Sequence, residues 1–232
     1  MTPSKFSITQ QSANIIEKSL TNPRLNSYSP PLVTVQPGET AKQASVRLYQ
    51  WNAEVAAALW PVMHVFEVTV RNAASEAINY VHGPNWAHDV SFQNKLPNPR
   101  PGLYNPRKDL RARADHFSTT GKIIPELKMA FWEKMFTARH DNDFWKHYLE
   151  QVFPNTPDLE YYSLRGEIRE KYANVRKIRN RLGHHESVSD PNRFDLHQIF
   201  DDMMAVLEWR DPVIRNWVDS FQTVEQTLSR RP

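Results

Sequence analysis

The stretch YYSLRGEIREKYANVRKIRNRL, residues 161–182, decides the fold class of this chain. On a helix that turns about 100° per residue, its apolar side chains fall on one stripe, as expected for a helix packed against a core. That stripe consists of Leu164, Ile168, Val175, Ile178 and Leu182. The pattern predicts a long, basic, amphipathic helix over about residues 159–184.

The rest of the chain shows the same helical spacing, interrupted mainly by prolines. Helices are expected over residues 8–20, 39–81, 109–117, 122–137, 144–152, 194–209 and 213–228, with Pro61 kinking or restarting the second of them. Proline-rich loops are expected within residues 26–38 and 91–107. Because no strand, repeat or linker signal is found, the simplest prediction is one all-α domain over residues 1–232, with an N-terminal helix and loop in residues 1–40.

Composition limits the classes of function. The absence of cysteine excludes disulfides, thiolate metal sites and a cysteine nucleophile. The N-terminus lacks an apolar run typical of a signal peptide, and residues 55–70 look too polar and too short to span a bilayer. We therefore expect a cytoplasmic protein with no membrane partner. The net charge of +3 permits nucleic-acid binding without requiring it.

A second stripe of the long helix is basic and leads toward its C-terminal end. It contains Arg165, Arg169, Arg176 and Arg179, with Tyr172 in the same row. One interpretation is a solvated flank whose aliphatic stems cover the edge of the core. The other is a phosphate-binding edge with Tyr172 stacking on a base. The direction of the row, toward Arg179, favours the second.

The helix ends in a guanidinium, an amide and an imidazole, from Arg179, Asn180 and His184. Asn180 and His184 share a face if the helix continues, whereas Arg179 and His184 lie about 140° apart on an ideal helix. The latter two converge only if Gly183 distorts or ends the helix, or if a second chain supplies a partner. Basic residues near a helix C-terminus also complement the helix dipole, so a purely structural role stays open.

The whole string IRNRLGHHES, residues 178–187, looks like the motif region of the HEPN superfamily, and most closely like its Abi-like (abortive infection) branch, which reads RNR-x-x-HHE. Three further stretches resemble that branch: LYQWNAEVAAALWPVMHVFEVTVRNA (48–73), GKIIPELKMAFWEKMF with DFWKHYLEQVFP (121–154), and the tail around Trp209. The resemblance covers about residues 12–218. Gly183 stands where alanine is common and Ser187 where proline is common, and neither departure removes a polar group.

The resemblance implies an all-α HEPN-type bundle with additional helices, forming a homodimer whose motifs lie in a cleft at the subunit interface. It also implies metal-independent RNA cleavage without a cofactor. His184 would take the proton from the ribose 2′-OH or give one to the leaving 5′ oxygen. Arg179 would neutralise the charge on the phosphorane oxygens, and Asn180 would orient the imidazole or the phosphate. Such a protein acts as a toxin in antiphage defence, restrained by an antitoxin that is a protein or an RNA.

A second polar cluster, Glu67, Arg71 and Asn72, lies on an otherwise apolar helix. Glu67 and Arg71 are spaced i, i+4, so a plain intrahelical ion pair is one expectation. The Abi-like branch has the same Glu-x3-Arg-Asn pattern, and we therefore expect the cluster to brace the cleft, with Glu67 holding Arg179 or His184. Glu67 lies in a segment expected to be largely buried, where a charge needs a partner.

The other histidines are given lesser roles. His185 and Glu186 extend the motif and are expected to support it or contact substrate. Adjacent side chains on a helix point apart, so the His184-His185-Glu186 string is a poor metal site. His64 is expected to be a core histidine, and the histidines and aspartates of residues 140–147 are given no role.

Three classes of function fit these patterns. The first is the endoribonuclease, the second a non-catalytic HEPN module that binds RNA, and the third an interaction protein that only dimerises. An inactive scaffold has no physical need for Arg179, Asn180 and His184 together, which argues against the third. The first two are not separated by sequence, and we expect the first.

Overall fold

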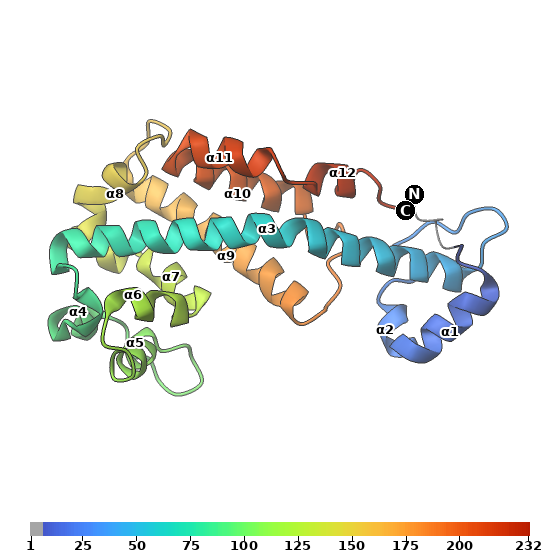
Figure 1. Cartoon of the computed structure of the whole chain (residues 1–232), viewed down its shortest axis with the longest axis horizontal. Coiled ribbons are helices and arrows are strands. Elements are labelled where there is room, and N and C mark those ends of the chain that lie inside the picture. Colours follow the sequence, from blue (N-terminus) through green and yellow to red (C-terminus); the bar gives the residue numbers. More distant parts are fainter. Residues whose placement is uncertain (1–6) are drawn as a thin grey trace. The chain divides into compact units, whose positions relative to one another are not determined.

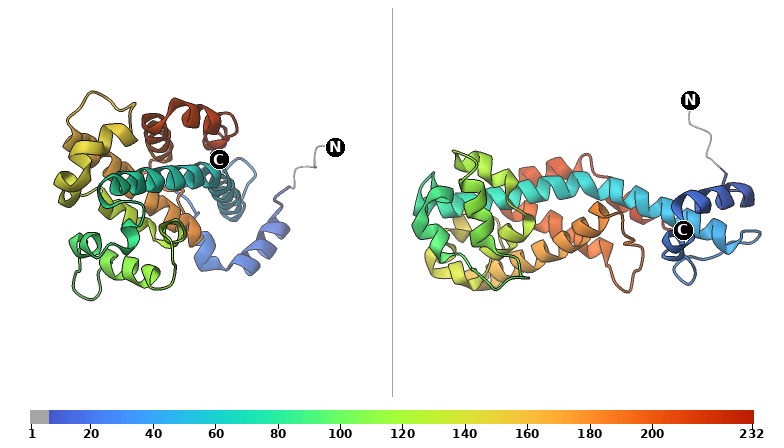
Figure 2. Two further views of the ribbon diagram at one scale, coloured as in Figure 1. Left: turned by 60° about the vertical axis from the view of Figure 1, so that its left-hand side comes forward. Right: turned by 90° about the horizontal axis from the view of Figure 1, so that it is seen from below.

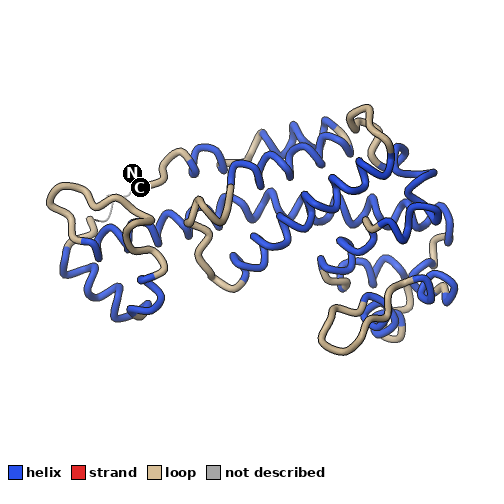
Figure 3. Tube along the Cα trace, turned by 180° about the vertical axis from the view of Figure 1, so that it is seen from behind, coloured by secondary structure: helices blue, strands red, loops and turns tan. Residues whose placement is uncertain are grey.

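The computed structural model describes residues 7–232, and the prediction of an all-α fold is confirmed. The structure is 69% helical, with no strand in the described part of the chain (Figure 3). The α-helices, labelled in Figure 1, are α1 (Gln10–Leu20), α2 (Asn22–Asn26), α3 (Ala41–His82), α4 (Val90–Lys95), α5 (Pro106–Ala114), α6 (Thr120–Ile123), α7 (Met129–Met135), α8 (Lys146–Val152), α9 (Tyr161–Gly183), α10 (Leu196–Arg210), α11 (Pro212–Asp219) and α12 (Val224–Leu228).

Helix α3 runs for 42 residues without a break at Pro61, and both views in Figure 2 show it as a single helix. A proline in this position removes one backbone N–H and normally kinks or ends a helix. The helix begins soon after Gly38 and ends before Gly83, whose φ of 75° and N–H bond to the Asn79 carbonyl, 2.9 Å, form the C-terminal cap. The expected restart at Pro61 is therefore not found.

The apolar stripe of α9 packs as the sequence predicts. Its five members are all buried, from fully buried Ile168 and Val175 to Leu182 with 4% of its surface exposed. The observed bounds, Tyr161–Gly183, agree with the predicted helix to within two residues at either end. Burial of this stripe, at about 1.5–3 kcal/mol for each large side chain, is what holds the helix in place.

Several shorter predictions need correction. The helix expected over residues 122–137 is interrupted at Pro125 by a 3-10 turn, Ile124–Glu126, which separates α6 from α7. The loop expected over residues 91–107 is helical at its start, in α4, and at its end, in α5. The last predicted helix, residues 213–228, is two helices, α11 and α12. A π-helical turn, Asp141–Trp145, precedes α8.

The chain forms two compact units. The first unit comprises residues 1–61, 178–200 and 222–232, of which residues 7–61 are described at its start. Its interior includes Ala13, Leu25 and Val46, and the Trp51 indole N–H donates to the Thr227 carbonyl at 2.9 Å. The long basic helix thus contributes its C-terminal end, Ile178 onward, to this unit.

The second unit comprises residues 62–177 and 201–221 and is rich in buried aromatic rings. The rings of Phe136 and Trp145 stack with centroids 4.6 Å apart, and Trp86 meets Trp132 edge-on at 6.3 Å. The indole N–H of Trp145 donates to the Met135 carbonyl at 2.7 Å, which satisfies its buried polar atom. These rings give the unit most of its large buried side chains.

Helix α3 is longer and more continuous than the segments expected from the sequence. By length and composition it could cross a membrane, and 39% of its most apolar 18-residue window is buried inside the protein. The buried core helix of a soluble protein passes the same test, so this property is weak evidence on location. The expectation of a cytoplasmic protein remains a prediction.

Candidate active site

The motif lies where α9 ends and the chain turns. The N–H of Glu186 donates to the Arg181 carbonyl at 2.8 Å, and the N–H of His185 donates to the Leu182 carbonyl at 3.0 Å. This pair of bonds is the Schellman cap, which requires a left-handed residue at its C′ position. That residue is His185, with φ of 56°, although glycine is usual there. The helix therefore ends at Gly183, but the left-handed turn is made by His185.

The segment after the helix is fixed by side chains of the first unit. Arg181 donates from Nε and Nη2 to the Ser187 carbonyl, at 3.1 and 2.9 Å, and from Nη1 to Glu186 at 2.9 Å. Arg24 of α2 donates to the His185 carbonyl at 2.6 Å. These bonds fix the chain directly after His184, which limits the freedom of its backbone.

The three predicted catalytic side chains are not engaged in bonds of their own. Among residues 7–232, no hydrogen bond or ion pair is formed by the side chains of Arg179, Asn180 or His184. Arg179 is half-buried with its Nε enclosed, whereas His184 is exposed. The backbone N–H of His184 donates to the Asn180 carbonyl at 3.0 Å. The backbone of His184 is therefore bonded to the last helical turn, and this fixes the point from which its imidazole extends. Free donors of this kind can bind an anion.

Glu186 and His185, which extend the motif, have different surroundings. The Glu186 carboxylate forms an ion pair with Arg181, and this pair stabilises the turn that follows α9. The His185 side chain is exposed and lines a hollow of about 320 Å³ that is also lined by Tyr28 and Trp60. A direct contact of either residue with substrate remains a prediction.

The arginine row of α9 is mostly neutralised within the second unit. Arg165 Nε lies 2.9 Å from Asp141, and Arg176 Nε lies 2.6 Å from Glu133. Arg169 is exposed and without an ion-pair partner in the described part of the chain. Neither interpretation of the row is therefore complete, because two of its arginines form half-buried ion pairs.

Tyr172 is not a surface ring. It is completely buried and stacks on Phe66, with ring centroids 5.6 Å apart and an interplanar angle of 29°. The expectation that it stacks on a nucleobase is wrong for this structure. On the helix Tyr172 lies at the border between the apolar stripe and the basic row, and the structure packs it with the stripe.

The cluster of Glu67, Arg71 and Asn72 lies in the second unit. Glu67 is half-buried, not fully buried, and no ion pair joins it to Arg71 among residues 7–232. The Nε of Arg71 is enclosed and lacks a hydrogen-bond partner there. The plain intrahelical pair is therefore not formed. The predicted contact of Glu67 with Arg179 or His184 joins residues of different units and stays a prediction.

Asn72 and His64 lie at the surface of the second unit. Asn72 lines a hollow of about 390 Å³ together with Asn79 and Trp86. His64 is exposed, so its expected place in the core is wrong. It lies on α3 at a position where the helix faces solvent, and it has no assigned role.

Sequence reasoning missed a charged cluster in the second unit. The His82 ring lies between two carboxylates, with Nδ1 and Nε2 each 3.1 Å from Asp89 and Asp143 respectively, and Lys95 also pairs with Asp143. Burial acts to raise the pKa of Asp143, but the bonds from Lys95 and His82 outweigh it and leave that pKa below its usual value. These residues come from separate turns of the chain, so the cluster could not be predicted from the spacing of residues in the sequence.

A nearby histidine, His140, is buried with both ring nitrogens lacking a hydrogen-bond partner in the described chain. Burial lowers its pKa to about 4, and its ring stacks on Phe144 at 5.2 Å. It is therefore a neutral core residue near pH 7. Among residues 7–232, no group of three or more His, Asp or Glu residues could hold a metal ion.

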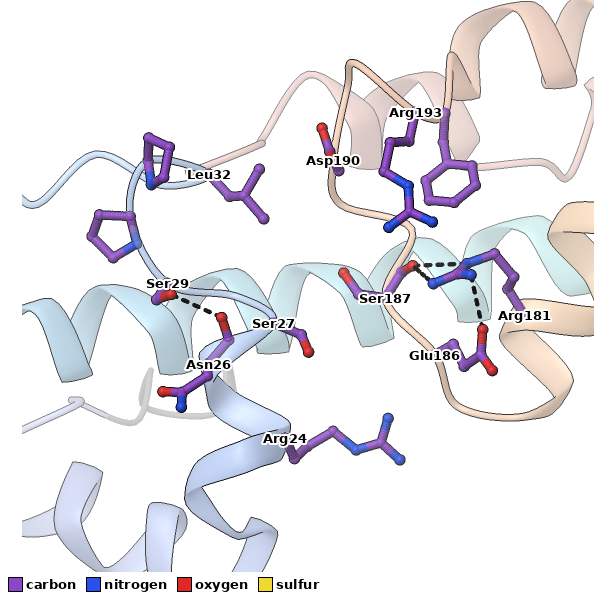
Figure 4. Close-up of a pocket in the computed structure, with 13 residues that line it drawn as sticks. Arg24, Asn26, Ser27, Ser29, Leu32, Arg181, Glu186, Ser187, Asp190 and Arg193 are labelled. Atoms are coloured by element: carbon purple, nitrogen blue, oxygen red, sulfur yellow. Dashed lines mark hydrogen bonds and ion pairs between the residues drawn. The ribbon is translucent and has the colours of Figure 1, made fainter.

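Sequence reasoning also missed a pocket beside the motif, shown in Figure 4. It has a volume of about 400 Å³ and is lined from two sides of the first unit, α2 with its following loop and the segment after α9. Three arginines lie on its wall, Arg24, Arg181 and Arg193. Arg24 is 161 residues from the His185 carbonyl that it binds, so only the fold brings them together.

Comparison of the chain with family models, with curated proteins and with solved structures found no match.

Proposed function

We propose that the protein is a metal-independent endoribonuclease that uses Arg179, Asn180 and His184. One observation carries the proposal. The arginines on either side of Arg179, Arg176 and Arg181, are bound to carboxylates, whereas Arg179, Asn180 and His184 have no side-chain partner among residues 7–232. Enclosing a charged donor without a partner costs free energy, as for the Arg179 Nε. Its presence in this site therefore favours a role in binding an external anion.

The proposed chemistry needs only a proton acceptor, a proton donor and a cation. The His184 imidazole removes the proton of a ribose 2′-OH, and the 2′ oxygen forms a bond to the adjacent phosphorus. The bond from phosphorus to the 5′ oxygen breaks, and that oxygen takes a proton from a protonated imidazole. Arg179 stabilises the negative charge on the non-bridging oxygens. The products are a 2′,3′-cyclic phosphate and a 5′-OH.

The acid and the base are proposed to come from two copies of the chain. His184 is exposed at the end of α9, where a second copy can approach it. A homodimer would then place two such imidazoles on one phosphodiester, one neutral and one protonated. The cellular role proposed with this activity is that of a cytoplasmic toxin in antiphage defence, held inactive by a protein or RNA antitoxin until infection.

The test is cleavage of total RNA by the purified full-length protein in the presence of EDTA, with mapping of the new ends. The matched pair is His184→Ala and His64→Ala, since both remove an exposed imidazole and His64 has no assigned role. Loss of about 10²- to 10⁴-fold in rate is expected for His184→Ala alone, with unchanged circular dichroism. New ends that are linear 3′-OH groups would exclude the mechanism.

Growth arrest on induced expression provides the cellular counterpart. Arrest by the wild type and by His64→Ala, with normal growth for His184→Ala, is the expected pattern. Equal arrest by all three variants would remove His184 from the mechanism. Binding of RNA by the wild type with no cleavage in any condition would favour the alternative function, a non-catalytic RNA-binding module.

A further inference from the structure

The pocket beside the motif combines guanidinium groups with hydroxyls. Figure 4 shows Arg24 on the side of α2, and Arg181 and Arg193 on the side of the segment that follows α9. Ser27, Ser29 and Ser187 line the space as well. Serine hydroxyls and guanidinium N–H groups both donate hydrogen bonds, so the wall carries several groups of the kind that bind an anion, although the Ser29 hydroxyl already donates to the Asn26 carbonyl at 2.8 Å.

The three arginines are not equally free. All three nitrogens of Arg181 are engaged, with the Ser187 carbonyl and Glu186, so this residue builds the wall. Arg24 uses Nη1 on the His185 carbonyl and keeps its other donors. Arg193 is exposed, and its side chain has no hydrogen bond or ion pair among residues 7–232. Two guanidinium groups therefore retain donors for a ligand.

Arg193 is held in place by an aromatic ring and not by a carboxylate. Its guanidinium carbon lies 5.4 Å from the centroid of Phe194, and that of Arg181 lies 4.8 Å from the same ring. A guanidinium that lies over a ring still has N–H groups free to donate. In an ion pair, some of these groups are bound and the positive charge is compensated by the carboxylate. Arg193 is thus positioned before a ligand arrives, which lowers the entropy lost on binding.

The charge balance of the pocket is positive. Its acidic residues are Glu186, which is neutralised by Arg181, and Asp190, whose carboxylate accepts the N–H of Asn192 at 3.0 Å. The volume of about 400 Å³ lies at the low end of the range of about 300–1,000 Å³ for small-molecule sites. It is large enough for a phosphate that carries a sugar, and its polar wall is a poor match for an apolar ligand.

We propose that this pocket binds nucleotide phosphate, supplied either by an RNA strand or by a free nucleotide, with Arg24 and Arg193 as donors at two separate points of its wall (Figure 4). A strand bound here is held next to the segment that follows His184, because Arg24 also binds the His185 carbonyl. The proposal rests on the proposed function for the identity of the strand and not for the binding itself. Arg181 and Phe194 are positioning residues.

The test uses the full chain and a fluorescein-labelled single-stranded RNA of 12 nucleotides with 2′-O-methyl riboses, which the proposed chemistry cannot cleave. Affinity is measured by anisotropy as a function of salt for wild type, Arg193→Gln and Arg100→Gln. Arg100 is an exposed arginine of the second unit without an ion-pair partner in the described chain, so its substitution is the matched control.

Loss of about tenfold in affinity is expected for Arg193→Gln alone, because one charge-assisted contact is removed. The slope of log K against log salt should also become shallower by about 0.7 for that variant. Competition with adenosine monophosphate and with inorganic phosphate identifies the source. If the monophosphate binds in an Arg193-dependent way and the RNA does not, the ligand is a free nucleotide.

Equal affinity of wild type, Arg193→Gln and Arg100→Gln for the RNA and for the monophosphate would overturn the proposal. Arg24→Gln is a second variant, whose loss of affinity should match or exceed that of Arg193→Gln because it also releases the His185 carbonyl. The two proposals can fail separately. If binding depends on Arg193 but no RNA is cleaved, the nuclease proposal is wrong and the pocket proposal stands. If cleavage depends on His184 but binding does not depend on Arg193, the pocket proposal is wrong and the nuclease proposal stands.

Discussion

The basic side chains of α9 differ in whether a carboxylate pairs with them, and the contrast is clearest between three of them in the second unit and Arg179 in the first. In the second unit, Arg165, Lys171 and Arg176 each lie within 3 Å of a carboxylate, at 2.9, 2.7 and 2.6 Å. In the first unit, Arg181 pairs with Glu186 at 2.9 Å, but Arg179 lacks such a partner among residues 7–232, as does the exposed Arg169 of the second unit. Both parts look basic in the sequence.

A row of positive charge is therefore not by itself a surface for nucleic acid. The donors of a paired arginine are bound to a carboxylate and contribute to stability, whereas those of an unpaired arginine can bind a phosphate. Two histidines show the same contrast, since His140 is buried and neutral whereas His184 is exposed. Substitutions in the two parts should therefore change different properties of the protein.

Among the substitutions that compare the two parts of α9, the largest effect is expected for Arg179→Gln, which removes the free guanidinium and leaves a shorter polar side chain. Cleavage of RNA should fall by about 10²- to 10³-fold, as for loss of one donor that stabilises transition-state charge. The midpoint of urea unfolding should change little, because no ion pair is lost. A variant that cleaves normally but unfolds at lower urea would assign Arg179 to the structural part of the helix.

Much of this helix could be predicted from the sequence. Its bounds and its apolar stripe follow from the spacing of Leu164, Ile168 and Val175 alone. The same spacing leaves Tyr172 at the border between the stripe and the basic row, so its burial is known only from the structure. Elements that depend on one proline, such as the break at Pro125, were less certain because proline is tolerated in a first turn.

The pairing of the charges could not be predicted. Asp141, Glu133 and Asp202 are 24, 43 and 31 residues from the basic groups that they bind. Arg24 is separated from His185 by 161 residues. Such contacts depend on how the helices pack, and they produce no periodic pattern in the sequence. The pairing of the basic side chains of α9 is therefore seen only in the structure.

The second prediction concerns His140 and the pH dependence of stability. Its folded pKa is lowered to about 4, chiefly by burial, while the unfolded chain takes up a proton near pH 6.5. Stability is therefore fully present above about pH 6.5 and falls as the pH drops toward 4, by up to about 3 kcal/mol from this group. Urea unfolding at several pH values in that window measures the loss.

The control for this prediction is His140→Phe, which keeps a ring beside Phe144 and Phe92. The difference between wild type and variant isolates the histidine from Asp89 and Asp143, whose pKa values are lowered and which lose their contribution at lower pH. An unchanged slope in His140→Phe would show that the histidine is not held neutral.

The third prediction is that Arg176→Gln loses stability and not affinity for RNA. The substitution leaves the Glu133 carboxylate, with 9% of its side chain exposed, without its partner at 2.6 Å. A cost of about 2 kcal/mol is expected, less than for a fully buried pair because Arg176 is 28% exposed. The double variant Arg176→Met with Glu133→Leu should recover most of it. Weaker RNA binding at unchanged stability would restore the arginine row as a phosphate-binding edge.

The smallest effect compares two glycines of α9, one in each part. A Cβ added at Gly166 or at Gly183 meets no atom within 4 Å, and neither residue has a positive φ. Gly166→Ala, in the helix interior, should therefore stabilise the protein by about 1 kcal/mol, and Gly183→Ala, at the last helical position, by about half as much. Cleavage should be unchanged in both, because the turn that carries His184 is made by His185 and anchored by Arg24. If Gly183→Ala alone alters cleavage, the freedom of the backbone at Gly183 is part of how His184 works, and the two parts of the helix differ in mobility as well as in charge pairing.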